Sequence, residues 1–169
     1  MNHAAIDQAE TLRNKQNGET SLESSARMTR VVAVTSGKGG VGKTAVVANI
    51  AIALARQGKK VLIIDADLGL ANIDVVLGLS PEYNLNHFFK GERSLEEIMV
   101  EGPYGIKVLP AGSGVQQYTR LDAQLKMRFI EAIDNLQEKF DMVLIDTEAG
   151  ISDNVTYFTV AAQDILVVT

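Results

Sequence analysis

Short apolar runs and longer periodic apolar stretches alternate along the chain from residue 30 onward. Five short runs predict β-strands at residues 31–35, 61–65, 106–109, 142–146 and 165–168. Residues 45–56 and 122–140 instead have the spacing of helices. The apolar positions of the second helix, three or four apart, are Leu125, Phe129, Ile133, Leu136 and Phe140. Strands that alternate with helices predict an α/β fold of three layers, with a mostly parallel sheet between helices.

A capping box, Ser94 with Glu97, predicts a short helix that continues to Val100. At the other end of the chain, residues 1–29 are polar and lack aromatic side chains, so we expect a flexible tail. Within this tail, Ala5, Ile6, Ala9 and Leu12 would share one face of a helix. The chain therefore divides into a tail at 1–29 and an α/β domain at 30–169.

Composition excludes some classes of protein. The formal net charge of −5 disfavours a protein that holds DNA through a broad basic surface. The chain has 0 cysteines, which excludes disulfides and thiolate metal sites and fits a cytoplasmic location.

No apolar run approaches the ~20 residues that span a bilayer. The last six residues, Asp164-Ile-Leu-Val-Val-Thr169, have the pattern of a central strand that is apolar on both faces, so we expect the chain to be the N-terminal piece of a longer protein, cut after its fifth strand.

The sequence from Ser36 to Thr44 lies between a predicted strand and a predicted helix, and it has the spacing of a phosphate-binding loop. Its glycines allow the backbone N–H groups to turn toward an anion at the helix N-terminus. Lys43 would contact the β- and γ-phosphates, and the Thr44 hydroxyl would bind Mg²⁺. The expected nucleotide contacts are Gly37, Lys38, Gly39, Gly40, Val41, Gly42, Lys43, Thr44 and Gly150.

Two aspartates follow the second predicted strand. Asp65 ends that strand, where it could reach Mg²⁺ through a water molecule. Asp67 lies in the following loop, where it could orient the water that attacks the γ-phosphate. The alternative is that Asp67 only caps a helix that begins near residue 71.

The run Met142-Val-Leu-Ile-Asp146 ends in a carboxylate, as a Walker B strand does. Asp146 would hold Mg²⁺ through the water shell of the metal, and the alternative for an isolated aspartate is a helix cap. The Gly150 N–H could sense the γ-phosphate and move a switch loop with it.

The string Lys38-Gly-Gly-Val-Gly-Lys-Thr44 resembles the deviant Walker A motif of the MinD/ParA ATPase family. The resemblance implies a dimer that forms with ATP and Mg²⁺, in which Lys38 reaches the phosphates of the opposite subunit. It also implies that Lys38, Lys43 and Asp67 are catalytic. Without the resemblance, Lys38 could simply be a solvated loop lysine. Glu148 stands where the family usually has glycine or proline, so the geometry of this second switch loop departs from the family pattern.

The tail sequence Asp7-Gln8-Ala9-Glu-Thr-Leu12-Arg13 resembles the Asp-Gln-Ala-x-x-Leu-Arg motif of the flagellar number regulators FlhG, FleN and YlxH. In that family the motif docks as a helix on the GTPase FlhF and stimulates its GTP hydrolysis. The resemblance implies that the five matching residues bind such a partner, and the alternative is an unstructured tail with a chance match. Branches of the MinD/ParA family that carry an iron–sulfur cluster are excluded because the chain lacks cysteine.

These features predict a cytoplasmic ATPase of low rate that acts as a switch through FlhF and, in some relatives, a flagellar transcription activator. Membrane contact would use a C-terminal helix that this chain does not contain. The competing interpretations are a partitioning or division-site ATPase of the ParA/MinD type, and a scaffold that binds nucleotide without hydrolysing it.

Overall fold

The structure of the chain is a computed structural model that describes residues 29–70, 72–112, 121–136 and 138–169. The strands are β1 (Arg30–Thr35), β2 (Val61–Ala66), β3 (Val100–Glu101), β4 (Lys107–Leu109), β5 (Met142–Thr147) and β6 (Asp164–Val167). The helices are α2 (Lys43–Arg56), α3 (Ile73–Leu77), α4 (Leu85–Phe89), α5 (Leu95–Ile98), α6 (Ala123–Asp134) and α7 (Asp153–Ala161), with a 3₁₀ turn, η1, at Pro103–Gly105.

The strands form one six-stranded sheet in the order β3-β4-β2-β5-β1-β6. Every pairing is parallel except that of β3 with β4. The carboxyl ends of β1, β2 and β5 therefore meet at one edge of the sheet. The register places Asp65 of β2 beside Asp146 of β5.

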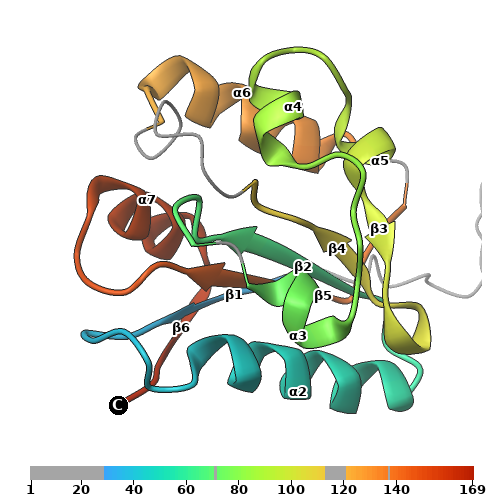
Figure 1. The fold of residues 1–169 in the computed structure, drawn as a ribbon, viewed down its shortest axis with the longest axis vertical. Coiled ribbons are helices and arrows are strands. Elements are labelled where there is room, and N and C mark those ends of the chain that lie inside the picture. Colours follow the sequence, from blue (N-terminus) through green and yellow to red (C-terminus); the bar gives the residue numbers. More distant parts are fainter. Residues whose placement is uncertain (1–28, 71, 113–120, 137) are drawn as a thin grey trace, which may run out of the picture.

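Helices cover both faces of the sheet (Figure 1). On one face, α2 packs with Val47 and Ala51 against Ile63 and Leu144 of the strands. On the other face, α4, α6 and α7 meet around a cluster of phenylalanines, Phe88, Phe89, Phe129 and Phe158. The predicted three-layer α/β fold with a mostly parallel sheet is confirmed.

Two predicted helices are shorter than expected. The helix predicted over 122–140 begins after the N-cap Asp122, whose carboxylate accepts the Leu125 N–H, and it ends at Asp134. Its apolar spacing continues past this end because Leu136 and Phe140 are still buried, although the chain has turned away from the helix axis. Helical spacing of apolar residues indicates only that these residues are buried on one side of the chain. Here the residues after the turn are still buried, so the spacing continues although the helix has ended.

The capping box of Ser94 and Glu97 is confirmed, with hydrogen bonds in both directions. The helix that it starts, α5, ends at Ile98, before the expected Val100, because Val100 joins the sheet as part of β3. This two-residue antiparallel strand raises the strand number from the expected five to six. Helices α4 and α7 were also not predicted, and both are short.

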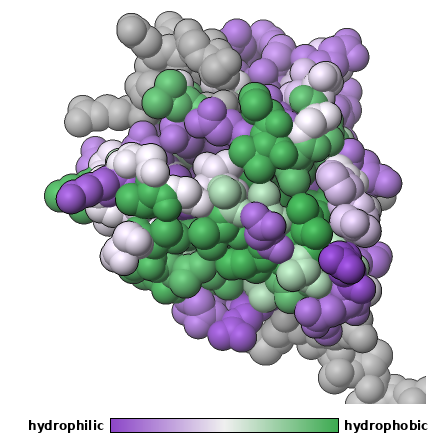
Figure 2. Space-filling view, turned by 60° about the horizontal axis from the view of Figure 1, so that its bottom comes forward, coloured by the Kyte–Doolittle hydropathy of each residue, from purple (hydrophilic) through white to green (hydrophobic). Residues whose placement is uncertain are grey.

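An apolar surface lies on the side of the molecule that carries α2 (Figure 2). Strand β6, at the edge of the sheet, leaves Ile165 54% and Val167 59% exposed. Val75 and Val76 of α3 are 74% and 50% exposed. Contiguous apolar surface of this kind is typical of a site of contact with a protein, a membrane or a ligand.

Candidate functional site

The loop between β1 and α2 has the backbone of an anion-binding cradle. Gly40 and Gly42 have φ angles of 76° and 89°, in the left-handed region that favours glycine. Gly42 is the N-cap of α2, and no side chain caps the amides of that helix end. Amides without a capping side chain at a helix N-terminus attract an anion. A Cβ atom built on Gly40 or Gly42 would meet nothing within 4 Å, so the space beside the loop is open.

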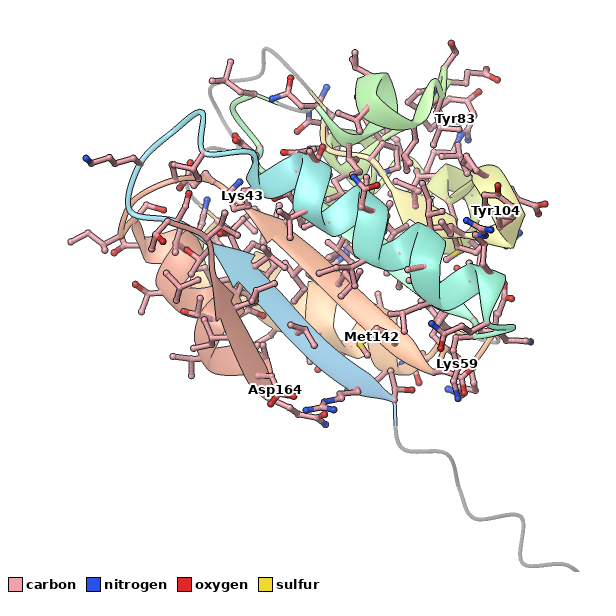
Figure 3. The ribbon with its side chains drawn as sticks, turned by 90° about the horizontal axis from the view of Figure 1, so that it is seen from below. Lys43, Lys59, Tyr83, Tyr104, Met142 and Asp164 are labelled. Carbon is pink, nitrogen blue, oxygen red and sulfur yellow. The ribbon has the colours of Figure 1, made fainter. Side chains whose placement is uncertain are left out.

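This loop forms one wall of a cavity of 640 Å³. Lys38, Lys43 and Thr44 line the cavity from the loop, Asp67 lines it from the loop after β2, and Glu148 lines it from the loop after β5. Lys43 lies where α2 begins, against the carboxyl ends of the strands (Figure 3). The volume lies within the range of small-ligand sites. The remaining lining residues are Ser36, Gly39, Gly40, Val41, Gly42, Gly69, Leu70, Asn72, Val75, Val76 and Ala149.

Lys43, which lines the cavity, forms a buried ion pair with Asp146, which is not among the lining residues. The Lys43 Nζ atom lies 3.0 Å from the Asp146 Oδ1 atom, and the two side chains are 9% and 2% exposed. Burial raises the pKa of Asp146, while hydrogen bonds from Thr44 and Lys43 and the charge of Lys43 oppose that rise. The structure therefore brings together the lysine, the threonine and the Walker B aspartate that the sequence predicted.

Asp65 organises the loop that follows β2. Its carboxylate accepts hydrogen bonds from the backbone N–H groups of Asp67, Asn72 and Ile73, at 3.2, 3.2 and 3.3 Å. Burial, followed by the charge of Asp146, raises the pKa of Asp65 to about 7. Asp65 thus fixes the path of the loop. The three amide hydrogen bonds lower the pKa of Asp65, and so they offset part of the cost of burying its charge.

The structure shows whether Asp67 caps the helix that follows its loop. Helix α3 begins at Ile73, and Asp65 accepts the Asn72 and Ile73 amides at its start. Asp67 instead accepts the Leu70 N–H at 2.9 Å within the loop, and its side chain borders the cavity. The helix-cap alternative for Asp67 is therefore wrong, and Asp65 makes the contacts that the alternative assigned to Asp67.

The loop after β5 is connected to the phosphate-binding loop. Gly150 has a φ angle of 99°, and its N–H donates to the Ser36 carbonyl at 2.9 Å. The Glu148 carboxylate accepts a hydrogen bond from the Ser152 hydroxyl, which also accepts the Val155 N–H as the N-cap of α7. Glu148 is thus hydrogen-bonded to the N-cap of α7, and it also lines the cavity.

The described residues contain no group of three or more His, Asp or Glu side chains that could hold a metal ion by themselves. Thr44, Asp65 and Asp146 supply one hydroxyl and two carboxylates near the end of the sheet. This oxygen set fits Mg²⁺, which keeps several waters and takes its other ligands from phosphates.

Two groups of predicted residues fare differently. The loop residues Gly37–Thr44, Asp65, Asp67, Asp146 and Gly150 converge at one edge of the sheet. The tail residues Asp7, Gln8, Ala9, Leu12 and Arg13 lie outside the described residues. Sequence reasoning missed the apolar part of the cavity wall, formed by Leu70, Val75 and Val76. The feature that could have indicated this wall is the group of apolar residues in and just before the short helix α3, which follows the loop after β2.

Comparisons with known proteins agree with this geometry. The sequence model of the AAA domain family matches residues 29–169. The antiactivator FleN of Pseudomonas aeruginosa is 45% identical over 139 residues, which are 82% of this chain and 50% of FleN. The flagellum site-determining protein YlxH of Helicobacter pylori is 35% identical over a match 170 positions long, which covers 100% of this chain and 57% of YlxH.

Among solved structures, the septum site-determining protein MinD from Pyrococcus horikoshii, complexed with Mg-ADP, superposes with a TM-score of 0.73 at 33% identity. The match covers 84% of this chain and 58% of MinD. The chain spans about half the length of the curated relatives that it matches. The chain belongs to the AAA domain family and is a P-loop protein of the MinD/ParA type, related to the flagellar regulators FleN and YlxH.

Proposed function

We propose that the protein binds ATP with Mg²⁺ in the 640 Å³ cavity and hydrolyses the γ-phosphate. The observation that carries this proposal is the ion pair of Lys43 with Asp146 at the base of the glycine cradle. It puts the phosphate-binding cation and the metal-binding carboxylate within contact of each other. The similarity to a MinD that was solved with Mg-ADP supports the same ligands.

The residues have separate tasks in this mechanism. The loop amides and Lys43 bind the β- and γ-phosphates and stabilise the charge that develops on the transferred phosphoryl group. Mg²⁺, when bound through Thr44, Asp146 and Asp65, neutralises phosphate charge. Asp67 orients the attacking water, because its carboxylate borders the cavity and its contact with Leu70 is local. To bind the γ-phosphate, the Gly150 N–H must leave the Ser36 carbonyl, which moves the loop after β5.

ATP would also control assembly. Lys38 is exposed on the cavity wall, so its side chain is available to a second subunit. If Lys38 contacts the opposite γ-phosphate, ATP binds the dimer more tightly than the monomer and shifts the equilibrium toward the dimer. The exposed Leu70, Val75 and Val76 beside the site would be buried in the same contact. The protein is then a dimerisation switch with a weak ATPase activity that a partner regulates.

The biological output that we propose is control of flagellar number and placement. The relatives FleN and YlxH are named for antiactivation and for flagellum site determination. YlxH matches the whole chain, including the tail that carries the Asp-Gln-Ala-x-x-Leu-Arg motif. The tail would dock on a GTPase of the FlhF type, and the ATPase domain would act on a flagellar transcription activator.

None of the helices in the described part of the chain has the length and apolar character of a membrane span. From the likeness to FleN and YlxH, we also propose that the protein is cytoplasmic and that its full-length ATP dimer associates peripherally with the inner membrane.

Full-length protein with and without residues 1–20 tests this output. Deletion should abolish stimulation of FlhF GTPase activity and leave ATP binding unchanged. Gln8→Ala, at the residue expected nearest the partner's catalytic water, should reproduce the loss, and Gln16→Ala is the matched control in the same tail. Equal stimulation by the intact and the shortened protein would contradict the role of the tail.

A partitioning or division-site ATPase is the second candidate, because the fold is that of MinD. ATP-dependent, salt-sensitive retention on random duplex DNA would favour the partitioning reading. A scaffold that does not hydrolyse ATP is the third candidate, suggested by Glu148 at the site. Single-turnover hydrolysis by full-length protein separates the scaffold from the switch, since a scaffold releases no phosphate.

A further inference from the structure

A second cavity, of 320 Å³, lies on the face of the sheet that α6 and α7 cover, away from the phosphate-binding loop. It is bounded by α6, by α7 and by the strands β1, β2 and β5, where it extends from Val31 to Ile64 and Ile145, and we call it the α6–α7 groove. Its walls are mainly apolar and include Val31, Leu62, Phe129, Ile133, Val143 and Phe158. Protein interiors rarely leave voids larger than a water molecule, and apolar cavities hold water poorly. The groove therefore favours an apolar occupant.

The first described residue of the chain lies in this groove. Thr29 lines it, and its hydroxyl donates to the Phe140 carbonyl at 2.7 Å. Residues 1–28 therefore start from the mouth of the groove. An extended chain advances about 3.3 Å per residue, so the residues between Leu12 and Thr29 are more than long enough to fold back.

The tail has an apolar helical face that needs such a surface. Ala5, Ile6, Ala9 and Leu12 share that face, with small alanines between two larger aliphatic side chains. Arg13 and Lys15 come directly after it. Two carboxylates, of Asp134 and Glu138, and one ammonium group, of Lys139, line the groove at the end of α6 and in the turn that follows. A short tether raises the effective concentration of the tail at the groove to about millimolar, so even a weak contact is occupied.

We propose that residues 5–13 fold back onto the α6–α7 groove, with Ile6 and Leu12 inserted between α6 and α7. The contact would hide Ala9 and Leu12 until a partner takes the tail. This second statement rests on the proposed function, whereas the docking itself does not. Ile6 lies outside the seven-residue motif, so it separates groove binding from partner binding. The groove and the nucleotide cavity have no lining residue in common, so tail docking should not change the affinity for Mg·ATP.

Hydrogen exchange measured by mass spectrometry on the full-length protein tests the docking. In Ile6→Asp, peptides from 129–140 and 158–163 should exchange about threefold faster than in the wild type, because the groove loses its cover. Thr11→Asp, which adds the same charge on the polar face of the tail, should match the wild type. Peptides from α2 should not change in either variant. Equal exchange of the groove peptides in the wild type and Ile6→Asp would overturn the proposal. Groove protection that disappears on dilution but survives Ile6→Asp would assign the groove to a second copy, which also overturns it.

A groove variant supplies the reciprocal test. Ala161 lines the groove at the end of α7 and is exposed, so Ala161→Phe should fill the groove without disturbing the core. Released tail should then be cut by trypsin after Arg13 about threefold faster than in the wild type. Val160→Phe, on the same helix and 80% exposed but not lining the groove, is the control. An unchanged cleavage rate in a folded Ala161→Phe protein would contradict the proposal. None of these measurements needs FlhF, so a failure of the proposed partner leaves the result readable.

Discussion

Asp65 and Asp146 are register partners on β2 and β5, and each is only 1% exposed. Asp146 has Lys43 beside it, and Asp65 has three backbone amides. The two buried carboxylates repel each other, and this repulsion adds to the effect of burial on the pKa of Asp65. The arrangement keeps two metal-binding groups next to each other at a cost in stability that a bound cation would relieve.

The raised pKa of Asp65 predicts a pH-dependent stability in the absence of nucleotide and Mg²⁺. Below the ordinary value of 3.8, Asp65 is protonated in both states and contributes nothing. As the pH rises toward about 7, the unfolded chain loses this proton first, so the free energy of unfolding falls. Asp65→Asn should remove this fall, which is about 4 kcal/mol at most. Urea unfolding at pH 5 and pH 8 measures the part of this fall that lies above pH 5, about 3 kcal/mol, with the exposed Asp153→Asn as control. A wild-type stability that does not fall between these two pH values would contradict the assignment.

The ion pair of Lys43 and Asp146 predicts that Lys43→Ala loses stability as well as nucleotide affinity. Removal of one partner of a buried pair leaves the other charge uncompensated, at a cost of about 3 kcal/mol. The double variant Lys43→Ala/Asp146→Asn should recover most of that loss while still failing to bind Mg·ATP. Thermal unfolding of the single and double variants measures the coupling. If the two losses simply add, the pair does not contribute as described.

Asp67→Ala should keep ATP bound and accumulate as a dimer. The Asp67 carboxylate accepts the Leu70 amide within its own loop, so its loss costs about 1 kcal/mol or less in stability. Loss of the water-orienting carboxylate would slow phosphate release much more than it weakens binding. Single-turnover hydrolysis together with light scattering checks this. A monomeric Asp67→Ala protein in saturating Mg·ATP would count against the switch assignment.

Lys38→Ala should bind Mg·ATP with near wild-type affinity but remain a monomer. The side chain is exposed on the cavity wall, and its proposed contact is made only across the dimer. Analytical ultracentrifugation with Asp67→Ala in the background, which prevents turnover, measures the assembly. Lys90→Ala, at another exposed lysine, is the control. Dimer formation by Lys38→Ala would show that this lysine does not link ATP to assembly.

The sheet and the phosphate site could be predicted because their residues are constrained locally. The carboxyl ends of parallel strands meet, so an aspartate that ends a strand and a glycine loop that follows one must converge. The role of Asp65 could not be predicted in this way, since its contacts with Asn72 and Ile73 depend on how the loop returns to the strand end. The end of α6 could not be predicted either. Leu136 and Phe140 lie beyond the end of the helix, but they are buried and continue its apolar spacing.

Short elements escaped prediction for a related reason. Strand β3 has only two residues, which are too few to show a pattern. Its pairing with β4 depends on contacts made elsewhere in the fold. No role was predicted for the apolar residues of α3, and the structure places Val75 and Val76 exposed beside the nucleotide cavity. Burial of an apolar residue is the usual expectation, and only the tertiary structure shows where that expectation fails.

The central claim is that a triphosphate and Mg²⁺ bind against the amides between Gly37 and Thr44. Calorimetric titration of Mg·ATP into full-length protein tests it most directly. We expect saturable heat for the wild type and for Lys59→Ala, just beyond the far end of α2 (Figure 3), and none for Lys43→Ala. Absence of heat with both Mg·ATP and Mg·GTP in a well-folded wild-type protein would contradict it.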